Sequence, residues 1–171
     1  MKVVLVGYMA SGKSSVGQSL ADNLDIDFID LDHHIEDEVG MSIEHIFSKK
    51  GEIFFRKKEF EVLQKVLSEE KDMVVSTGGG TPCYGNNMQT ILDSADLSVY
   101  LQLSIPSLVK RISKEKDTRP LVKNISDEDL PEFIGKHLFE RRNYYMNANE
   151  IIVSDNKSIS EIVNEIKSKL L

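Results

Sequence analysis

The chain has 171 residues, of which 40% are hydrophobic and 29% are charged, and its formal net charge is −7. This length and composition suit one globular domain with a complete core, and the acidic balance argues against a nucleic-acid partner, which would need a basic surface. The only cysteine, Cys83, leaves no disulfide framework or thiolate metal cluster. No apolar run is long enough to span a membrane, and the N-terminus leads into a strand pattern without a signal peptide. We therefore expect a cytoplasmic monomer with no membrane partner.

Strand and helix patterns alternate along the chain. Apolar runs predict strands at residues 2–6, 27–30, 73–76, 97–103 and 150–153. Helical spacing and caps predict helices at about residues 12–24, 33–39, 43–50, 52–70, 86–94, 106–114, 127–145 and from Ser158 onward. Five apolar strands separated by helices predict an α/β fold of three layers, in which helices cover both faces of a five-stranded parallel sheet.

The stretch Gly-Tyr-Met-Ala-Ser-Gly-Lys-Ser at residues 7–14 fits the pattern G-x-x-x-x-G-K-[ST]. It lies between a predicted strand and a predicted helix, which is the context of a phosphate-binding loop. Successive backbone N–H groups and the helix N-terminus then face one anion. Lys13 is expected to reach the β- and γ-phosphates and the Ser14 hydroxyl to bind Mg²⁺. The stretch therefore predicts nucleotide binding.

Two carboxylates, Asp30 and Asp32, follow the second predicted strand. On an extended chain, side chains two residues apart point to the same side, and parallel sheets bind their ligands at the carboxyl ends of the strands. One carboxylate can hold Mg²⁺ while the other accepts a proton from a substrate hydroxyl. The alternative for each is a helix cap.

Three consecutive glycines, Gly78, Gly79 and Gly80, follow the third predicted strand. Such a run weakens any regular element, so it predicts either a flexible turn or a backbone wall that a polar substrate approaches closely. Residues 114–124 are charged, contain Pro120 and have no apolar period, which predicts a mobile lid.

Arginines elsewhere are uninformative when each is taken alone. Arg56 and Glu59 are three residues apart on a predicted helix and could simply pair on its solvated face. Arg119, in the predicted lid, and Arg141, on a later helix, are surface charges by default.

Taken together, these scattered motifs resemble one family, the shikimate kinases, over nearly the whole chain. That family carries G-x-x-x-x-G-K-[ST], D-x-D, G-E-x-x-F-R-x-x-E, G-G-G, R-P-L and R-x-P-x-Y in this order. Here the motifs correspond to residues 7–14, 30–32, 51–59, 78–80, 119–121 and 141–145. The resemblance implies a single P-loop kinase domain over residues 1–171, with a substrate-binding helical region at about 33–70 and the lid at about 114–124.

The resemblance also implies a reaction, in which the γ-phosphoryl group of ATP passes to the 3-hydroxyl of shikimate to give shikimate 3-phosphate, on the route to chorismate and the aromatic amino acids. Lys13, Asp32 and Arg119 would be catalytic, with Asp32 as the base, and Ser14 and Asp30 would hold Mg²⁺. Shikimate would be bound by Asp32, Arg56, Gly78, Gly79, Gly80 and Arg141, with the guanidinium groups forking onto its carboxylate. ATP would be bound by Ala10, Ser11, Gly12, Lys13, Ser14, Ser15, Arg111 and Arg119.

Two departures from the family pattern leave details open. Asn143 stands where the last motif has proline, which leaves the local helix end open. Residues 155–157 lack the arginine that some members place against adenine, which leaves the adenine contacts open.

Two alternative functions are also consistent with a phosphate-binding loop. A kinase for gluconate or a nucleoside monophosphate would not need the aspartate pair together with Arg56 and Arg141. A GTPase-like switch would carry D-x-x-G at a strand end and N-K-x-D further on. Residues 37–40 do spell D-x-x-G, but they fall in a predicted helix, and Asn156-Lys157 is not followed by the required aspartate.

Overall fold

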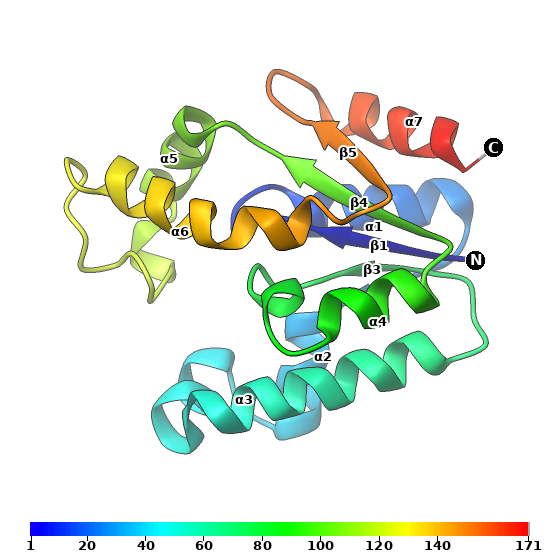
Figure 1. The fold of residues 1–171 in the computed structure, drawn as a ribbon, viewed down its shortest axis with the longest axis horizontal. Helices are drawn as coiled ribbons and strands as arrows, with labels where there is room; N and C mark the ends of the chain where they lie inside the picture. The colour runs from blue at the N-terminus through cyan, green and yellow to red at the C-terminus, as the bar shows by residue number, and fades with distance from the viewer. Residues whose placement is uncertain (171) are drawn as a thin grey trace.

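The computed structural model describes residues 1–170 and contains a five-stranded, entirely parallel sheet (Figure 1). The strands are β1 (Lys2–Val6), β2 (Asp27–Asp30), β3 (Met73–Ser76), β4 (Leu97–Gln102) and β5 (Glu150–Val153), in the spatial order β2-β3-β1-β4-β5. The central strand β1 pairs with β3 on one side and β4 on the other. Its run of fully buried valines and leucine is typical of a strand covered on both faces.

Helices cover both faces of this sheet, which confirms the expected three layers. The helices are α1 (Lys13–Leu24), α2 (Leu31–Val39), α3 (Ile43–Ser68), α4 (Asn87–Ser94), α5 (Ile105–Lys114), α6 (Leu130–Tyr145) and α7 (Ile159–Lys169), with short 3-10 helices η1 (Thr81–Cys83) and η2 (Lys116–Thr118). Side chains alternate along β1, so Val3 and Leu5 join a core with α1 and α7. Val4 and Val6 join the larger core, to which α2 to α6 contribute.

Several boundaries differ from the sequence prediction for local reasons. Helix α2 begins two residues early, because the Asp30 carboxylate ends β2 and caps the helix by accepting from the His33 N–H at 3.3 Å. Helix α6 begins later, at Leu130, with Pro131 in its first turn. Residues 114–124 include η2 and are therefore partly regular. Gly51, with φ of 85°, interrupts α3 as expected.

The carboxyl ends of the strands point toward α5 and η2, and both chain termini lie at the opposite end of the sheet (Figure 1). The loops after β1, β2 and β3 therefore open onto one edge. None of the helices within residues 1–170 is both long and apolar enough to cross a lipid bilayer.

Candidate active site

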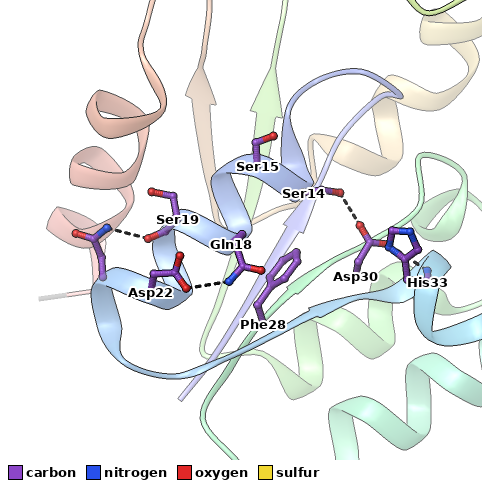
Figure 2. Close-up of a pocket in the computed structure, with 9 residues that line it drawn as sticks. Ser14, Ser15, Gln18, Ser19, Asp22, Phe28, Asp30 and His33 are labelled. Atoms are coloured by element: carbon purple, nitrogen blue, oxygen red, sulfur yellow. Dashed lines mark hydrogen bonds and ion pairs between the residues drawn. The ribbon is translucent and has the colours of Figure 1, made fainter. Parts of the chain in front are cut away.

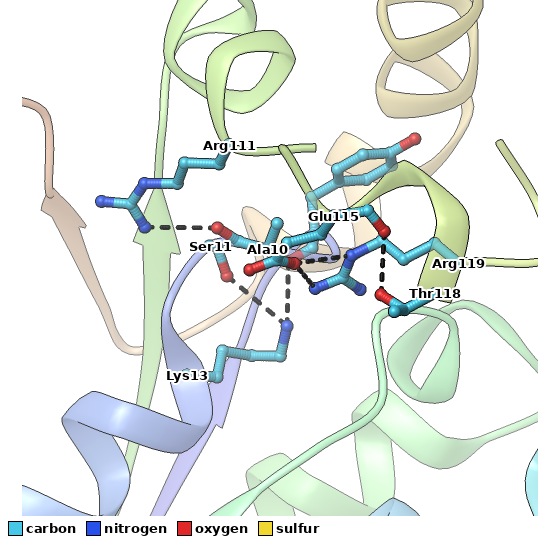
Figure 3. Close-up of polar contacts among 8 residues, drawn as sticks. Ala10, Ser11, Lys13, Arg111, Glu115, Thr118 and Arg119 are labelled. Carbon is cyan, nitrogen blue, oxygen red and sulfur yellow. Dashed lines mark hydrogen bonds and ion pairs between the residues drawn. The ribbon is translucent and has the colours of Figure 1, made fainter. Parts of the chain in front are cut away.

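The loop after β1 folds as a phosphate-binding loop does. Gly7, with φ of 150°, brings the backbone so close to Leu101 that a Cβ would lie 2.9 Å from its carbonyl oxygen. Gly12, with φ of 92°, is the N-cap of α1 in a conformation that side chains rarely adopt. Lys13 folds back over this loop (Figure 3). Its ammonium group donates to the carbonyl oxygens of Gly7 at 2.8 Å and Tyr8 at 2.9 Å.

Burial makes the Lys13 ammonium easier to deprotonate than an ordinary lysine. Desolvation is the main cause that lowers its pKa from 10.5 to about 8; Arg119 and Arg141 lower the pKa further, while Asp32 and Asp30 oppose the shift. At neutral pH the group is still mostly protonated. It is a cation held away from water, so an incoming phosphate finds a positive charge with few solvent contacts to lose.

Ser14 and Asp30 meet at the mouth of the loop. The Ser14 hydroxyl, on the first turn of α1, donates to Asp30 Oδ2 at the end of β2 at 2.5 Å (Figure 2). A hydroxyl and a carboxylate are hard oxygen ligands of the kind Mg²⁺ takes, and Mg²⁺ keeps several waters and substrate phosphates besides. The two residues present therefore fit a magnesium ion. Asp30 serves both as a helix cap and as a candidate metal ligand.

Asp32 lies in the first turn of α2, so the expectation of two carboxylates on one extended segment is wrong. Asp30 and Asp32 nevertheless line the same cavity, and the pKa of Asp32 rises to about 6. Burial is the largest cause of this rise, Asp30 and Glu59 add to it, and Lys13 opposes it. A carboxylate with a pKa near the working pH suits a general base.

The three glycines after β3 are the surface on which the polar side chains converge. A Cβ on Gly78 would lie 2.7 Å from Asp32 Oδ1. A Cβ on Gly80 would lie 2.9 Å from Arg56 Nη2 and 3.2 Å from Arg141 Nη2. A side chain at either end would have to displace these polar groups. The protein's own side chains therefore approach the glycines closely, while the approach of a substrate stays a prediction.

Arg56 does not pair on a solvated face. Its Nη1 donates at 2.8 Å to Glu59, whose side chain is only 1% exposed. The second oxygen of Glu59 accepts from the Thr81 hydroxyl at 2.8 Å. Glu59 and Thr81 therefore tie the arginine to the end of the glycine stretch. Sequence reasoning missed this role of both residues, although the family motif that ends at Glu59 carried a signal for one of them.

Tyr145, at the end of α6, is a third residue whose role sequence reasoning missed, although the last family motif ends at it. Its hydroxyl donates to the Gly79 carbonyl at 2.5 Å, and its buried ring lies 5.2 Å from that of Tyr100. Helix α6 continues through Asn143 to this tyrosine, and Arg141, one turn earlier, still reaches the glycines. The absence of the family proline therefore leaves the helix unbroken.

Two arginines from α5 and the predicted lid face the loop from the other side (Figure 3). Arg111 Nη1 donates to the Ala10 carbonyl at 3.2 Å. Arg119 donates to Glu115 Oε2 from both Nε, at 2.9 Å, and Nη2, at 2.5 Å. Arg119 is thus held by the Glu115 carboxylate.

A cavity of about 350 Å³ joins the phosphate-binding loop to the two aspartates, to the first two of the three glycines and to the lid. Arg56, Gly80 and Arg141 are not among its lining residues and lie beyond Gly79. It is lined by Met9, Ala10, Ser11, Gly12, Lys13, Ser14, Ser15, Asp30, Asp32, Thr77, Gly78, Gly79, Arg111, Glu115 and Arg119. A larger hollow of about 650 Å³ runs along the outside of α1 and shares Ser14, Ser15 and Asp30 with it (Figure 2). No lysine or arginine lines that hollow, whereas Lys13, Arg111 and Arg119 line the smaller cavity, which is therefore the better candidate for an anion site.

Comparison with known proteins agrees with this geometry. A family model described as shikimate kinase matches residues 9–171. A shikimate kinase from Flavobacterium psychrophilum is 44% identical over 165 residues, which cover 96% of each chain. The crystal structure of shikimate kinase from Bacteroides thetaiotaomicron superimposes with a TM-score of 0.91 at 32% identity, covering 99% of this chain and 98% of that one. The chain belongs to the shikimate kinase family.

A further structure of the shikimate kinase family, from Acinetobacter baumannii, was solved in complex with shikimate. It matches with a TM-score of 0.89 at 30% identity, covering 99% of this chain and 92% of that one. Family membership confirms the expected P-loop kinase fold and ATP-dependent phosphotransfer. The GTPase-like alternative is set aside also because residues 37–40 end α2, with Gly40 as its C-cap, and do not follow a strand.

Proposed function

We propose that this chain transfers the γ-phosphoryl group of ATP to the 3-hydroxyl of shikimate. The observation that carries the substrate assignment is the convergence of Arg56 and Arg141 on Gly80, next to the cavity of the phosphate-binding loop. Two guanidinium groups at one point call for an anion with several acceptor oxygens, and a carboxylate accepts their parallel N–H bonds well.

The spacing along the glycines fits a small hydroxylated acid. Asp32 contacts the Gly78 end and the two arginines contact the Gly80 end. Because two residues of chain span at most about 7 Å, the points of contact on Gly78 and Gly80 are no farther apart than the length of a small ring with its substituents. A ring with its carboxylate on the arginines therefore presents a hydroxyl to Asp32 and to the phosphate-binding loop beyond it.

Within this arrangement each group has a stated task. Asp32 accepts the proton of the attacking hydroxyl, which its raised pKa favours. Lys13 leaves the carbonyl oxygens of its own loop and donates to the phosphates, where charge spreads over the transferring oxygens. Arg119 exchanges Glu115 for the same phosphate as the lid closes.

A magnesium ion belongs to this proposal. Ser14 and Asp30 would hold it through their hydroxyl and carboxylate oxygens. When bound, the ion supplies charge neutralisation at the β- and γ-phosphates. The monomeric state and the cytoplasmic location expected from the sequence stay predictions.

An ADP-release assay that presents shikimate, gluconate and nucleoside monophosphates side by side tests the proposal. We expect turnover with shikimate and ATP only, and its loss in Lys13→Met. An Arg142→Met variant is the control, because it also replaces a cation with methionine but at an exposed position. Turnover with gluconate or a nucleotide acceptor, and none with shikimate, would refute the assignment.

A further inference from the structure

The Arg56 guanidinium has one face against an aromatic ring that none of the family motifs contains. Its Cζ lies 3.7 Å from the centroid of the Tyr84 ring, which is stacking distance. A second ring, that of Phe55, lies farther away at 5.0 Å. A cation at such a distance is attracted by the negative face of the ring. Tyr84 is thus the closest aromatic neighbour of the arginine in the proposed substrate site.

Backbone hydrogen bonds on both sides of Tyr84 in the chain hold it near the glycines. It is the C-cap of η1, the short helix that begins directly after Gly80. The Cys83 N–H donates to the Gly80 carbonyl at 2.9 Å, and the Asn87 N–H donates to the Tyr84 carbonyl at 3.2 Å. The backbone that carries the ring is therefore fixed relative to the glycines that the arginines approach.

Hydrogen bonds alone leave the plane of this guanidinium only partly determined. Nη1 is bound to Glu59, whereas the buried Nε has no hydrogen-bond partner among residues 1–170 and only a long ion-pair contact of 3.9 Å to Glu52 Oε1. A single anchored edge lets the plane rotate, and a stacked ring prevents this without using any N–H group. The groups that point in the plane stay free to form parallel bonds to a carboxylate.

We propose that Tyr84 is a positioning residue that sets the plane of the Arg56 guanidinium and thereby the affinity for the substrate carboxylate. The inference rests on the proposed function, because it takes the carboxylate to be that of shikimate. The carboxylate lies away from the reacting hydroxyl, so the stacking acts equally on bound substrate and transition state. Its loss raises KM and leaves kcat unchanged.

Kinetics of Tyr84→Leu and Tyr84→Phe test this inference. Cation–π contacts contribute about 0.5–2 kcal/mol, so Tyr84→Leu should raise the KM for shikimate about 2- to 30-fold, with kcat and the KM for ATP unchanged. Tyr84→Phe keeps the ring and should stay within about twofold of the parent protein. The Tyr84 hydroxyl forms no hydrogen bond among residues 1–170, which supports this expectation.

Two controls separate positioning from general disturbance. Phe139→Leu removes an aromatic ring that is 82% exposed on α6 and should change nothing. In an Arg56→Lys background, Tyr84→Leu should have less effect than in the parent protein, because an ammonium has no plane to orient. Should Tyr84→Leu prove too unstable for kinetics, Tyr84→Met removes the ring with less loss of volume.

Two results would overturn the inference: a parental KM in a folded Tyr84→Leu or Tyr84→Met protein, or an equal loss in Tyr84→Phe. Either leaves the proposed function intact. Failure of the proposed function shows itself separately, as an absence of shikimate turnover in the parent protein measured in the same series.

Discussion

Replacing Asp32 with asparagine should stabilise the ligand-free protein although it disables the enzyme. The carboxyl is held among Asp30, Glu59 and Glu36, all of which disfavour its ionised form, and burial adds the largest penalty. Asparagine has nearly the same shape and carries no charge. A residue in the site that lowers the stability of the folded protein is expected where activity depends on its chemistry.

The size of the effect follows from the pKa. That of Asp32 rises from 3.8 to about 6, and one pKa unit corresponds to about 1.4 kcal/mol. Ionising the carboxyl therefore costs the folded state at most about 3 kcal/mol at neutral pH, with the attraction of Lys13 already included. In a chain of this size, each kcal/mol of added stability raises the Tm by about 2–4 °C.

The pH dependence gives the sign. Between about pH 4 and pH 6 the folded carboxyl holds its proton while the unfolded one has lost it, so the stability of the parent protein falls as the pH rises through this window. Asparagine does not titrate. The advantage of Asp32→Asn should therefore be absent near pH 4, grow up to about pH 6 and stay constant above it.

Urea unfolding of both proteins at a series of pH values, without nucleotide, measures this difference. Asp37→Asn is the matched control, because Asp37 is exposed on the same helix α2. An Asp32→Asn protein that is less stable than the parent at pH 7, or whose advantage does not depend on pH, would refute the reasoning.

Three further outcomes are expected. Arg141→Lys should raise the KM for shikimate about ten- to a hundredfold, since a charge-assisted bond contributes about 1.5–3 kcal/mol; steady-state kinetics with an unchanged KM would reject its carboxylate role. Gly80→Ala should raise the same KM and leave the KM for ATP unchanged, because its methyl group displaces the ends of Arg56 and Arg141; equal effects on both substrates would indicate a general distortion. Glu115→Gln should lower the KM for ATP by no more than about fivefold, because the half-exposed pair with Arg119 contributes little; a raised KM would mean that Glu115 orients Arg119 for catalysis.

Most of the fold could be predicted from the sequence, because its elements carry local signals. The buried run of β1 and the loop glycines each depend on residues close in the chain. The same holds for the capping box of α7, in which the side chains of Ser158 and Glu161 each accept a hydrogen bond from the backbone N–H of the other residue. The start of α2 was misjudged because Asp30 fits a strand end and a helix cap equally well. Which of the two roles Asp30 takes depends on the neighbouring phosphate-binding loop, because its carboxylate accepts a hydrogen bond from the Ser14 hydroxyl.

The residues of the candidate site likewise divide into those that local sequence predicts and those that it does not. The phosphate-binding loop is contiguous, so its role follows from spacing. The burial of Glu59 does not follow from spacing, because an i,i+3 pair with Arg56 has the same sequence pattern on an exposed or a buried face. Only the packing of η1 against α3, which brings Thr81 to the second oxygen of Glu59, turns that pair into part of the site. No periodicity in the sequence reports such a contact between distant segments.

The three glycines explain why the site residues were harder to predict than the site itself. A glycine run indicates that something approaches the backbone closely, but without a side chain it cannot indicate what. In the structure, Gly78 receives the proposed base, and Gly80 receives the two proposed carboxylate ligands. Along the glycines the proposed base comes first and the two arginines come last. This order matches a substrate with its reacting hydroxyl at one end and its carboxylate at the other. Because each approach comes from a different helix, the arrangement depends on how α2, α3 and α6 pack on the sheet.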